Sequence, residues 1–564
     1  MHIVLARVAA DRVMAVRLGD EGGSLGIEFV LDPVAFVRAE EPHHPRWVWD
    51  DTSRWYPYLL EAGVRVERCF DLRLCHAILR SSSLTAGSDL ATAERNVWDA
   101  PPAALPRDEP DGALFELDDP LFDPDDPVEP EAPADPLAEY MLQRAAVASS
   151  AEPGRIGRLL AAESAGALIA CEMQFAGLPW RASEHDAILT GILGARPRVD
   201  GDRPEKIQAL LEQVRELLEA PELNPDSPSD LLKALGRAGL MATSTRSWEL
   251  KKLKHPAIEP LLEYKKMARL LSANGWQWLD TWVVNGRFRP DYVPGGTATG
   301  RWATSGGGAL QLPRQIRGAV VADEGWKLVV ADASQLEPRI LAAMAGDRGM
   351  VAAGSAGDLY AGIVASGAVE TRDQAKVAML GAMYGATTGE SGRLMPKLAR
   401  AYPQAIGMVE DAARAGERGE IVTTQLGRSS PRPGSGWQQA QADAYGETAT
   451  ESETSRARGQ SRAWGRFTRN FIVQGTAAEW ALCWMAGIRR RLMALQPDAA
   501  MTDAPHLVFF LHDEVVVHAP AELAHTVAAE ITAAAADAGR LLFGGIPAEF
   551  PLTVAIVDNY AQAK

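Results

Sequence analysis

A short apolar hairpin near the C-terminus is the feature that most restricts how this chain can fold. Residues 507–511 and 515–517 are rich in β-forming side chains. They are separated by only His512, Asp513 and Glu514. Two neighbouring carboxylates at the tip of an apolar hairpin repel each other unless a cation neutralises them. A plain surface turn is the alternative, but the apolar flanks favour a tip that lies against a core or a cleft.

A further acid follows another apolar run. Residues 328–331 predict a buried strand that leads into Asp332, and a helix is expected to start near Ser334. A carboxylate at the end of a buried strand suits Mg²⁺, which takes one or two protein carboxylates and leaves positions for substrate phosphates. A loop or capping role for Asp332 stays open, as does an S-x-x-E capping box formed by Ser334 and Glu337.

Asp332 and Asp513 together have the chemistry to hold two divalent ions. Two such ions, about 3.5 to 4 Å apart, stabilise the attacking and leaving oxygens of a phosphoryl displacement. Polymerases and nucleases share this arrangement, so the carboxylates alone do not distinguish between the two classes.

A helical pattern favours the polymerases. Arg372, Lys376, Leu380 and Tyr384 recur every four residues, which places them on one slowly turning helix face. Two cations, an apolar residue and an aromatic ring in a row match a triphosphate, a sugar and a base. A hydrolytic nuclease has no use for such a face, and the chain contains no GxxxxGK[ST] phosphate loop.

The charge of the chain is unevenly distributed. Its 57 Lys and Arg against 74 Asp and Glu give a net charge of −17, which by itself argues against a nucleic-acid partner. Twelve of the acids, and no basic residue, lie between positions 108 and 135, so a local basic groove elsewhere is still possible. Four cysteines without a CxxC pair, a charged N-terminus and the lack of a long uncharged apolar run predict a cytoplasmic protein.

Composition and periodicity divide the N-terminal part into three segments. Residues 1–100 begin with two strand-like runs and predict a small α/β domain. Residues 101–136 are rich in Pro, Asp and Glu and predict an acidic linker or loop. Residues 137–162 predict a connecting helical segment.

Three ordered motifs resemble those of family A DNA polymerases, the polymerase I type. They read DASQLEPR at 332–339, RDQAKVAMLGAMYG at 372–385 and HDE at 512–514. Further matches are TATGRWATS at 297–305, TQLGR at 424–428 and RFTRNFIVQGTAAE at 466–479. The likeness runs from about residue 163 to the C-terminus. It implies an α+β right-hand polymerase fold with palm, fingers and thumb, preceded by a small α/β domain of the ribonuclease H-like exonuclease type.

The resemblance also implies where these parts lie. Residues 163–290 would hold the start of the palm and the thumb, and 291–347 the palm segment with the first metal aspartate. Residues 348–465 would form the fingers, and 466–564 the rest of the palm with the second metal aspartate.

Site residues carry over at the matching positions. Asp332 and Asp513 would bind two Mg²⁺ ions, for which Mn²⁺ can substitute, with help from the backbone of Ala333 and support from Glu514. The residues expected to bind the nucleotide are Arg372 and Lys376 at the triphosphate, Gln335, Leu380, Tyr384, and Glu337 as the gate against a ribose 2′-OH. The residues expected to contact DNA are Arg301, Arg466, Asn470, Gln474 and His512, with phosphate contacts from Arg456, Arg458, Arg462 and Arg469 unless these lie on a plain solvated face.

Several positions depart from the family pattern. Leu380 stands where an aromatic ring is usual, Ala333 where a tyrosine is usual, and Pro338 follows the gate glutamate, so we expect altered rate and sugar discrimination. Residues 1–100 contain no D-x-E pair, and Tyr140 is followed four places on by Arg144 instead of an aspartate. Because proofreading needs those carboxylates for its metals, we expect a degenerate, non-proofreading domain.

The expected function is that of a DNA-directed DNA polymerase, which adds dNTPs to a primer 3′-OH by a two-metal mechanism. Because no 5′-nuclease domain precedes the rest, we expect repair or gap filling on primer–template DNA. We expect a monomer in the cytoplasm, at the nucleoid, without a membrane partner. A catalytically decayed DNA-binding scaffold and a metal-dependent nuclease remain as alternatives.

Overall fold

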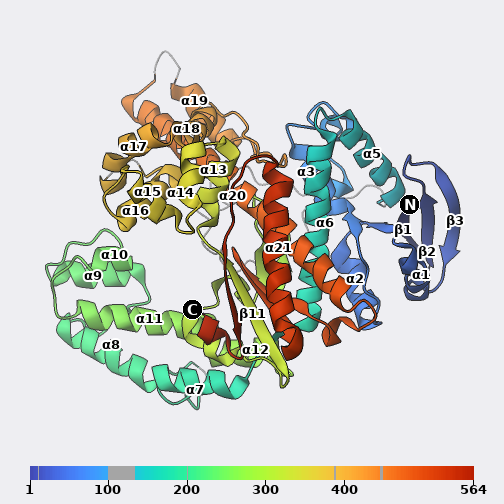
Figure 1. Cartoon of the computed structure of the whole chain (residues 1–564). Coiled ribbons are helices and arrows are strands. Elements are labelled where there is room, and N and C mark those ends of the chain that lie inside the picture. The colour runs from blue at the N-terminus through green and yellow to red at the C-terminus, as the bar shows by residue number, and fades with distance from the viewer. Residues whose placement is uncertain (10–11, 100–133, 200, 387–388, 445–448, 564) are drawn as a thin grey trace. The chain divides into compact units, whose positions relative to one another are not determined.

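The structure, a computed structural model, describes residues 1–9, 12–99, 134–199, 201–386, 389–444 and 449–563. Most of the expected acidic linker, 101–136, therefore lies outside the described residues. Helices and strands are mixed along the chain (Figure 1), which confirms the predicted α+β class. The chain divides into two compact units: Met1–Ala176 with Pro290–Leu310 and Gly325–Ile556, and Gly177–Arg289 with Gln311–Glu324 and Val557–Lys564.

A five-stranded sheet begins the first unit. Its strand order is β3-β2-β1-β4-β5, in which β1 pairs antiparallel with β2 and parallel with β4. The strands are β1 (His2–Ala9), β2 (Arg12–Leu18), β3 (Ser24–Val30), β4 (Arg46–Trp49) and β5 (Cys69–Asp71). The two strands expected at the N-terminus are β1 and β2, so this segment has the mixed α/β character that its sequence predicts.

Helices cover this sheet and complete its core. They are α1 (Pro33–Glu40), α2 (Thr52–Glu61), α3 (Leu72–Ser81), α4 (Asp89–Thr92) and α5 (Pro136–Ser149). Tyr140 of α5 packs with Val4, Val16 and Leu72 in one apolar cluster. The helix expected as a connection thus contributes its own side chains to the core of the α/β domain.

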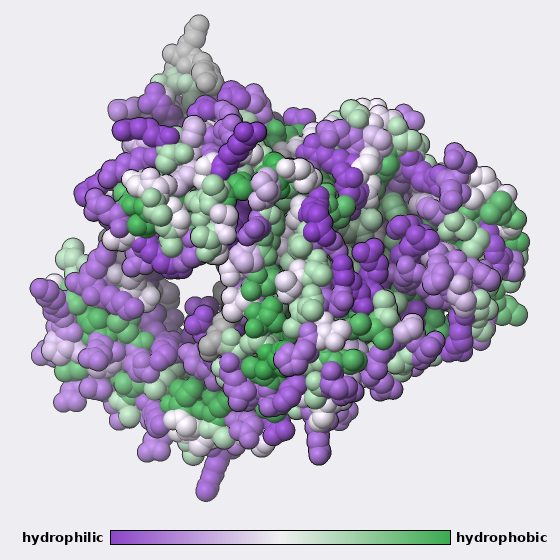
Figure 2. Space-filling model, viewed as in Figure 1, coloured by the Kyte–Doolittle hydropathy of each residue, from purple (hydrophilic) through white to green (hydrophobic). Residues whose placement is uncertain are grey.

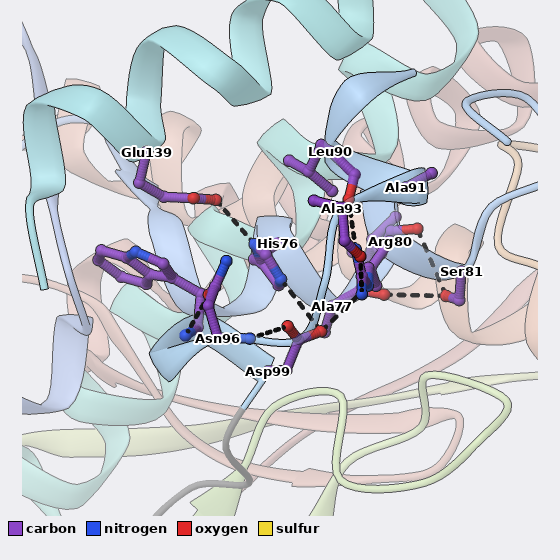
Figure 3. Close-up of polar contacts among 12 residues, drawn as sticks. His76, Ala77, Arg80, Ser81, Leu90, Ala91, Ala93, Asn96, Asp99 and Glu139 are labelled. Atoms are coloured by element: carbon purple, nitrogen blue, oxygen red, sulfur yellow. Dashed lines mark hydrogen bonds and ion pairs between the residues drawn. The ribbon is translucent and has the colours of Figure 1, made fainter. Parts of the chain in front are cut away.

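A buried polar cluster ties α3 to α5 (Figure 3). His76 Nδ1 lies 2.8 Å from Glu139 Oε1, and His76 Nε2 lies 3.4 Å from Asp99 Oδ1. Arg80 Nε adds a contact of 3.1 Å to the same Asp99 oxygen and donates from its NH₂ groups to the carbonyls of Leu90 and Ala93. The contacts of Arg80 with Asp99, Leu90 and Ala93 fix the segment 89–99 against α3.

The outer strand β3 presents apolar side chains to solvent. Leu25, Ile27 and Phe29 alternate along it and are each at least 60% exposed. Figure 2 shows green side chains gathered at this edge of the domain. An edge strand of this kind is able to pair with the edge of another chain.

A second sheet, of four strands, lies at the centre of the first unit. Its order is β12-β13-β11-β14, with β11 (Trp326–Ala333), β12 (His506–Leu511), β13 (Glu514–Pro520) and β14 (Leu552–Val557). β13 pairs antiparallel with both β11 and β12. A two-stranded sheet, β9 (Asp291–Val293) with β10 (Ala303–Gly306), belongs to the same unit.

Long helices pack against this four-stranded sheet. They are α6 (Pro153–Ala176), α20 (Glu451–Leu495) and α21 (Ala524–Phe543), and α21 crosses in front of β11 in Figure 1. Among the described helices, α6 alone is long and apolar enough to cross a membrane, but 72% of its apolar window is buried inside the protein. It therefore has the burial expected of a core helix.

A buried ion cluster joins the α/β domain to α6 and α20. Glu172 of α6 accepts hydrogen bonds from Arg65 over 2.8 Å, from Arg489 of α20 over 2.7 Å and from Tyr56 over 2.6 Å. Burial alone would raise the pKa of Glu172, but the Arg489 and Arg65 charges outweigh it and hold the pKa well below its usual range.

The remaining helices of the first unit form a bundle around the N-terminal half of α20. They are α13 (Leu336–Ala345), α14 (Arg348–Gly354), α15 (Leu359–Ala365), α16 (Arg372–Tyr384), α17 (Gly389–Ala401), α18 (Pro403–Glu417) and α19 (Ser435–Ala444). The 45-residue helix α20 starts with a capping box, in which Thr450 and Glu453 exchange hydrogen bonds.

The second unit is mainly helical. It contains α7 (Ala182–Leu193), α8 (Glu205–Leu217), α9 (Pro228–Arg237), α10 (Ser247–Leu250), α11 (Ile258–Asn274) and α12 (Trp276–Trp282). Three short strands, β6 (Leu178–Pro179), β7 (Val283–Val284) and β8 (Arg287–Phe288), form its sheet. Val214, Leu231, Leu250 and Leu261 share its main apolar cluster.

Candidate active site

Asp332 and Asp513 lie at the same end of the four-stranded sheet. Asp332 is the last residue but one of β11 and pairs with Glu514 of β13. The N–H of Ala333 donates to the carbonyl oxygen of Asp513 over 2.8 Å. The two aspartates are 181 positions apart in the chain, and these contacts bring Asp332 of β11 beside Asp513, the residue just before β13.

The predicted hairpin is formed by β12 and β13. Its turn consists of His512 and Asp513, and His512 adopts a left-handed backbone with φ 58°. The N–H of Asp513 donates to the carbonyl of Leu511 over 2.7 Å. Glu514, expected at the tip beside Asp513, is instead the first residue of β13 and is buried.

Glu337 does not cap its helix. α13 begins at Leu336 instead of near Ser334, and its N-cap residue is Gln335, in a left-handed conformation with φ 55°. The capping-box interpretation is therefore wrong. The Glu337 carboxylate instead forms an ion pair with Arg301 and accepts a hydrogen bond from the Tyr384 hydroxyl over 2.9 Å.

A cavity of about 80 Å³ brings several of the expected residues together. Its polar lining includes Arg301, Glu337, His512 and Asp513. Its apolar lining comes from Trp302, Leu336, Phe510 and the α20 side chains of Ala477, Ala481, Leu482 and Met485. The Arg301–Glu337 ion pair and the carboxylate of Asp513, a candidate metal ligand, therefore share one small, largely apolar recess.

The helix predicted from the four-residue repeat is α16. Arg372, Lys376 and Leu380 are exposed, and Leu380 has 37% of its surface in solvent. The opposite face, with Ala375, Ala378, Met379, Ala382 and Met383, is buried. The expected cationic and apolar row is thus the face that the helix leaves open.

Tyr384, at the C-terminal end of this row, is held against Glu337. Burial, followed by the nearby Glu337 carboxylate, raises the pKa of Tyr384. The hydroxyl therefore stays protonated and remains a hydrogen-bond donor at neutral pH. Gly385 ends α16 with φ 73°, and a Cβ atom there would lie 2.7 Å from Cγ of Arg466. The end of α16 consequently packs directly on α20.

The remaining residues expected to contact DNA are distributed along α20. Arg466 is exposed, Gln474 is half-buried and Asn470 is buried. Of the arginine row, Arg456, Arg458 and Arg462 are also exposed.

The structure corrects the expected role of Arg469 in the arginine row. Its side chain is buried and donates a hydrogen bond to the carbonyl of Ala382 over 2.9 Å. It also pairs with Glu410. Its side chain links α20 to α16 and α18, so it is not part of an exposed cationic face.

Sequence reasoning missed Asp358, which precedes α15. Its Oδ2 accepts a hydrogen bond from Arg372 Nε over 2.8 Å, and its Oδ1 accepts one from Gln335 Nε2 over 2.7 Å. Gln335 and Arg372, both expected to bind the nucleotide, are therefore linked through this carboxylate. The pattern Gly-Asp-Leu-Tyr signals a helix N-cap, and nothing in it signals a partner for Arg372.

The donor set fits a hard divalent cation. Among the described residues, no group of three or more His, Cys, Asp or Glu side chains is gathered to hold a metal ion. Mg²⁺ needs fewer, since it commonly uses one or two carboxylates and takes its other oxygens from water and phosphates. Two carboxylates, Asp332 and Asp513, stand at one sheet end, and Ala333, buried beside them, has a backbone carbonyl to add.

Comparison with known proteins identifies the family to which the chain is similar. The family described as DNA polymerase family A matches residues 199–557. A curated relative, the thermostable DNA polymerase I of Thermus thermophilus, is 26% identical over 369 residues, covering 59% of this chain and 40% of that protein. DNA polymerase I of Chloroflexus aurantiacus is 28% identical over 321 residues, covering 51% of this chain and 31% of that protein. The chain spans about two fifths or less of the length of these two relatives.

A solved structure shares the fold. The POL domain of Pol1 from M. smegmatis, in complex with DNA primer-template and dNTP, aligns with a TM-score of 0.66 and 17% identity. The alignment covers 100% of this chain and 96% of that one. The right-hand fold expected from the motifs is therefore confirmed, and the matched family covers well over half of the chain. This chain belongs to DNA polymerase family A.

Proposed function

We propose that the protein is a DNA-directed DNA polymerase that extends a primer 3′-OH with dNTPs on a template strand. The observation that carries the proposal is the meeting of Asp332, near the end of β11, with Asp513, in the turn before β13, next to a recess lined by Arg301, Glu337 and His512. Family membership and the names of the relatives support it.

The aspartates would hold two Mg²⁺ ions, with Mn²⁺ as a substitute. When bound, the two metal ions would lower the pKa of the attacking hydroxyl and offset the charge that develops on the leaving pyrophosphate. The carboxylates of Asp332 and Asp513 and the carbonyl of Ala333 would be the ligands. Glu514, buried at the start of β13, would keep the hairpin end in place.

The open face of α16 would bind the incoming nucleotide. Arg372 and Lys376 would hold the triphosphate and stabilise the departing negative charge. Leu380 would contact the sugar and base through apolar surface alone, and Tyr384 would lie beside the new base pair.

Glu337 would be the gate against a ribose 2′-OH. Its carboxylate is fixed by Arg301 and Tyr384, so it has little freedom to withdraw from a bulkier sugar. Gln335, joined to Asp358, would support the nucleotide pocket from the start of α13.

Primer and template would be contacted through the minor groove by Arg301, Arg466, Asn470, Gln474 and His512. Every Watson–Crick pair offers acceptors there, whatever the sequence, so arginine and amide donors check the shape of the pair and ignore its identity. Arg456, Arg458 and Arg462 would add contacts to phosphates.

We assign the four-stranded sheet to the palm, α14–α19 to the fingers and the second unit to the thumb. The N-terminal α/β domain would lack proofreading activity. Its Tyr140 is buried in the core and bonds to His2, and Arg144 lies over the Tyr140 ring, 5.8 Å from its centre. This tyrosine is unavailable for a catalytic role. Gap filling or repair at the nucleoid, in the cytoplasm and without a membrane partner, is the biological role we propose.

We also propose that the protein is a monomer. The exposed edge strand β3 offers a specific way to test the monomeric state, since pairing through β3 would give a dimer. Light scattering at increasing concentration, on the wild type and on Ile27→Lys, is expected to give the monomer mass throughout. A wild-type dimer that Ile27→Lys abolishes would contradict the proposal.

Primer extension tests the function directly. The wild type with Mg²⁺ and four dNTPs should extend a primed template, and Asp513→Asn should not. Asp503→Asn removes the same charge at an exposed position before β12 and should extend like the wild type. Degradation of the primer without dNTPs would favour the nuclease, and DNA binding without extension would favour the decayed scaffold.

A further inference from the structure

Asp358 distributes four hydrogen bonds between its two oxygens. Oδ1 accepts from Gln335 Nε2 over 2.7 Å and from the backbone N–H groups of Tyr360 and Ala361 over 2.9 and 3.2 Å. Oδ2 accepts from Arg372 Nε over 2.8 Å. One carboxylate oxygen therefore caps α15 and holds Gln335, while the other is given to the arginine.

The pair with Arg372 is partly open to solvent. The side chain of Arg372 is 54% exposed and that of Asp358 is 38% exposed. The guanidinium also lies over the ring of Tyr360, 5.5 Å from its centre. The Asp358 carboxylate is thus paired with Arg372, the arginine that binds the triphosphate in the proposed function.

We propose that Asp358 competes with phosphate for Arg372 and thereby keeps triphosphate and pyrophosphate binding weak. This inference rests on the proposed function, in which Arg372 grips the incoming nucleotide. A phosphate that takes the guanidinium must displace the carboxylate or lie close to it, and either effect opposes binding by Coulomb repulsion or by loss of the ion pair.

The exchange is reversible because Asp358 does not depend on Arg372. When the guanidinium leaves, the carboxylate keeps Gln335 and two backbone donors, so its charge remains hydrogen-bonded. After the chemical step the same carboxylate can take Arg372 back as pyrophosphate departs. Asp358 is therefore a positioning residue that affects affinity through Arg372 and does not touch the reacting atoms.

A purely structural role for Asp358 can be separated from this one. Asparagine caps helices about as well as aspartate, so Asp358→Asn keeps the start of α15 and removes only the charge. Asp358→Ser, also a good cap, repeats the test with a different shape. Asp373→Asn is the matched control, because it removes one negative charge at the residue next to Arg372, in the first turn of α16.

The experiment compares KM and kcat for a dNTP, and the inhibition constant of pyrophosphate, in primer extension. Exposed ion pairs contribute modestly, so Asp358→Asn and Asp358→Ser should each lower KM and the inhibition constant about two- to fivefold. Asp373→Asn should change both by less than twofold. In an Arg372→Ala background, the effect of Asp358→Asn should disappear.

Unchanged or raised constants in Asp358→Asn and Asp358→Ser, or an equal effect without Arg372, would overturn the proposal. Failure of the proposed function gives a different result, since the wild type itself would then fail to extend a primer.

Discussion

The Tyr384 hydroxyl donates to Glu337 over 2.9 Å, which joins the last residue of α16 to the first turn of α13. The acid expected to exclude a ribose is thereby fixed by the helix expected to bind the nucleotide. Loss of this hydrogen bond should loosen the gate without removing it.

Tyr384→Phe should therefore lower the preference for dNTP over rNTP. Hydrogen bonds to charged groups contribute about 1.5 kcal/mol or more, so we expect a decrease of about tenfold in the ratio of kcat/KM values. Tyr402→Phe removes a hydroxyl that bonds to Ser366 elsewhere among these helices and should leave the ratio unchanged. An unaltered ratio in Tyr384→Phe would show that Glu337 needs no support from this hydroxyl.

Glu172→Gln should strongly destabilise the protein. The substitution keeps the shape but leaves the buried Arg489 and the partly buried Arg65 without a counter-charge, which lowers the free energy of unfolding by about 3 to 5 kcal/mol. Glu67→Gln changes a partly exposed acid that pairs with His44 and should alter stability by less than about 0.5 kcal/mol. Thermal unfolding of both variants checks the difference, and similar melting temperatures would contradict this account of the buried cluster.

Glu479 should make stability depend on pH. Burial raises the pKa of Glu479 to about 7, against hydrogen bonds from Thr424 and the N–H of Leu426. The folded protein binds the proton of the Glu479 carboxyl more tightly than the unfolded chain does. The stability that this protonation adds is therefore full below pH 4.5 and is lost as pH rises through 7. Glu479→Gln should thus gain melting temperature relative to the wild type between pH 5 and 8. A difference between the two proteins that stays constant over this range would refute the shift.

Two glycines of α18 should respond oppositely to alanine. A Cβ at Gly416 would lie 2.0 Å from Oγ1 of Thr468 on α20, whereas one at Gly407 meets nothing within 4 Å. Gly416→Ala should lower the free energy of unfolding by about 1 to 3 kcal/mol through overpacking. Gly407→Ala should raise it by up to about 1 kcal/mol through helix propensity. Chemical denaturation of the two variants measures the contrast, and equal effects would mean that α18 and α20 are not this closely packed.

The spacing of apolar residues and the positions of charged residues in the sequence were sufficient to predict the helices and strands that carry the site. The apolar run that leads into Asp332 predicts a strand end, and the two apolar runs on either side of residues 512–514 predict a hairpin with Asp513 at its tip. The four-residue repeat from Arg372 predicts a helix that gathers these residues on one face. These signals are local, and the sheet register, which pairs Asp332 with Glu514 next to Asp513, agrees with them.

Partners made by tertiary contacts were not predictable in this way. Glu337 fitted a capping box by spacing, but the left-handed Gln335 moves the start of the helix, and Arg301 and Tyr384 take the carboxylate. Arg469 followed the arginine row, yet the packing of α18 buries it against Glu410. Asp358 has the local signature of a helix cap, and its bond to Arg372 depends on how α15 and α16 fold together.

Counting bound metal ions tests the central claim most directly. Mn²⁺ can be titrated by electron paramagnetic resonance into a complex of protein, dideoxy-terminated primer–template and matching dNTP, in which no reaction occurs. The account predicts two tightly bound ions in the wild type and in Asp503→Asn, and fewer than two in Asp332→Asn and in Asp513→Asn. Two ions of unchanged affinity in both aspartate variants would contradict it.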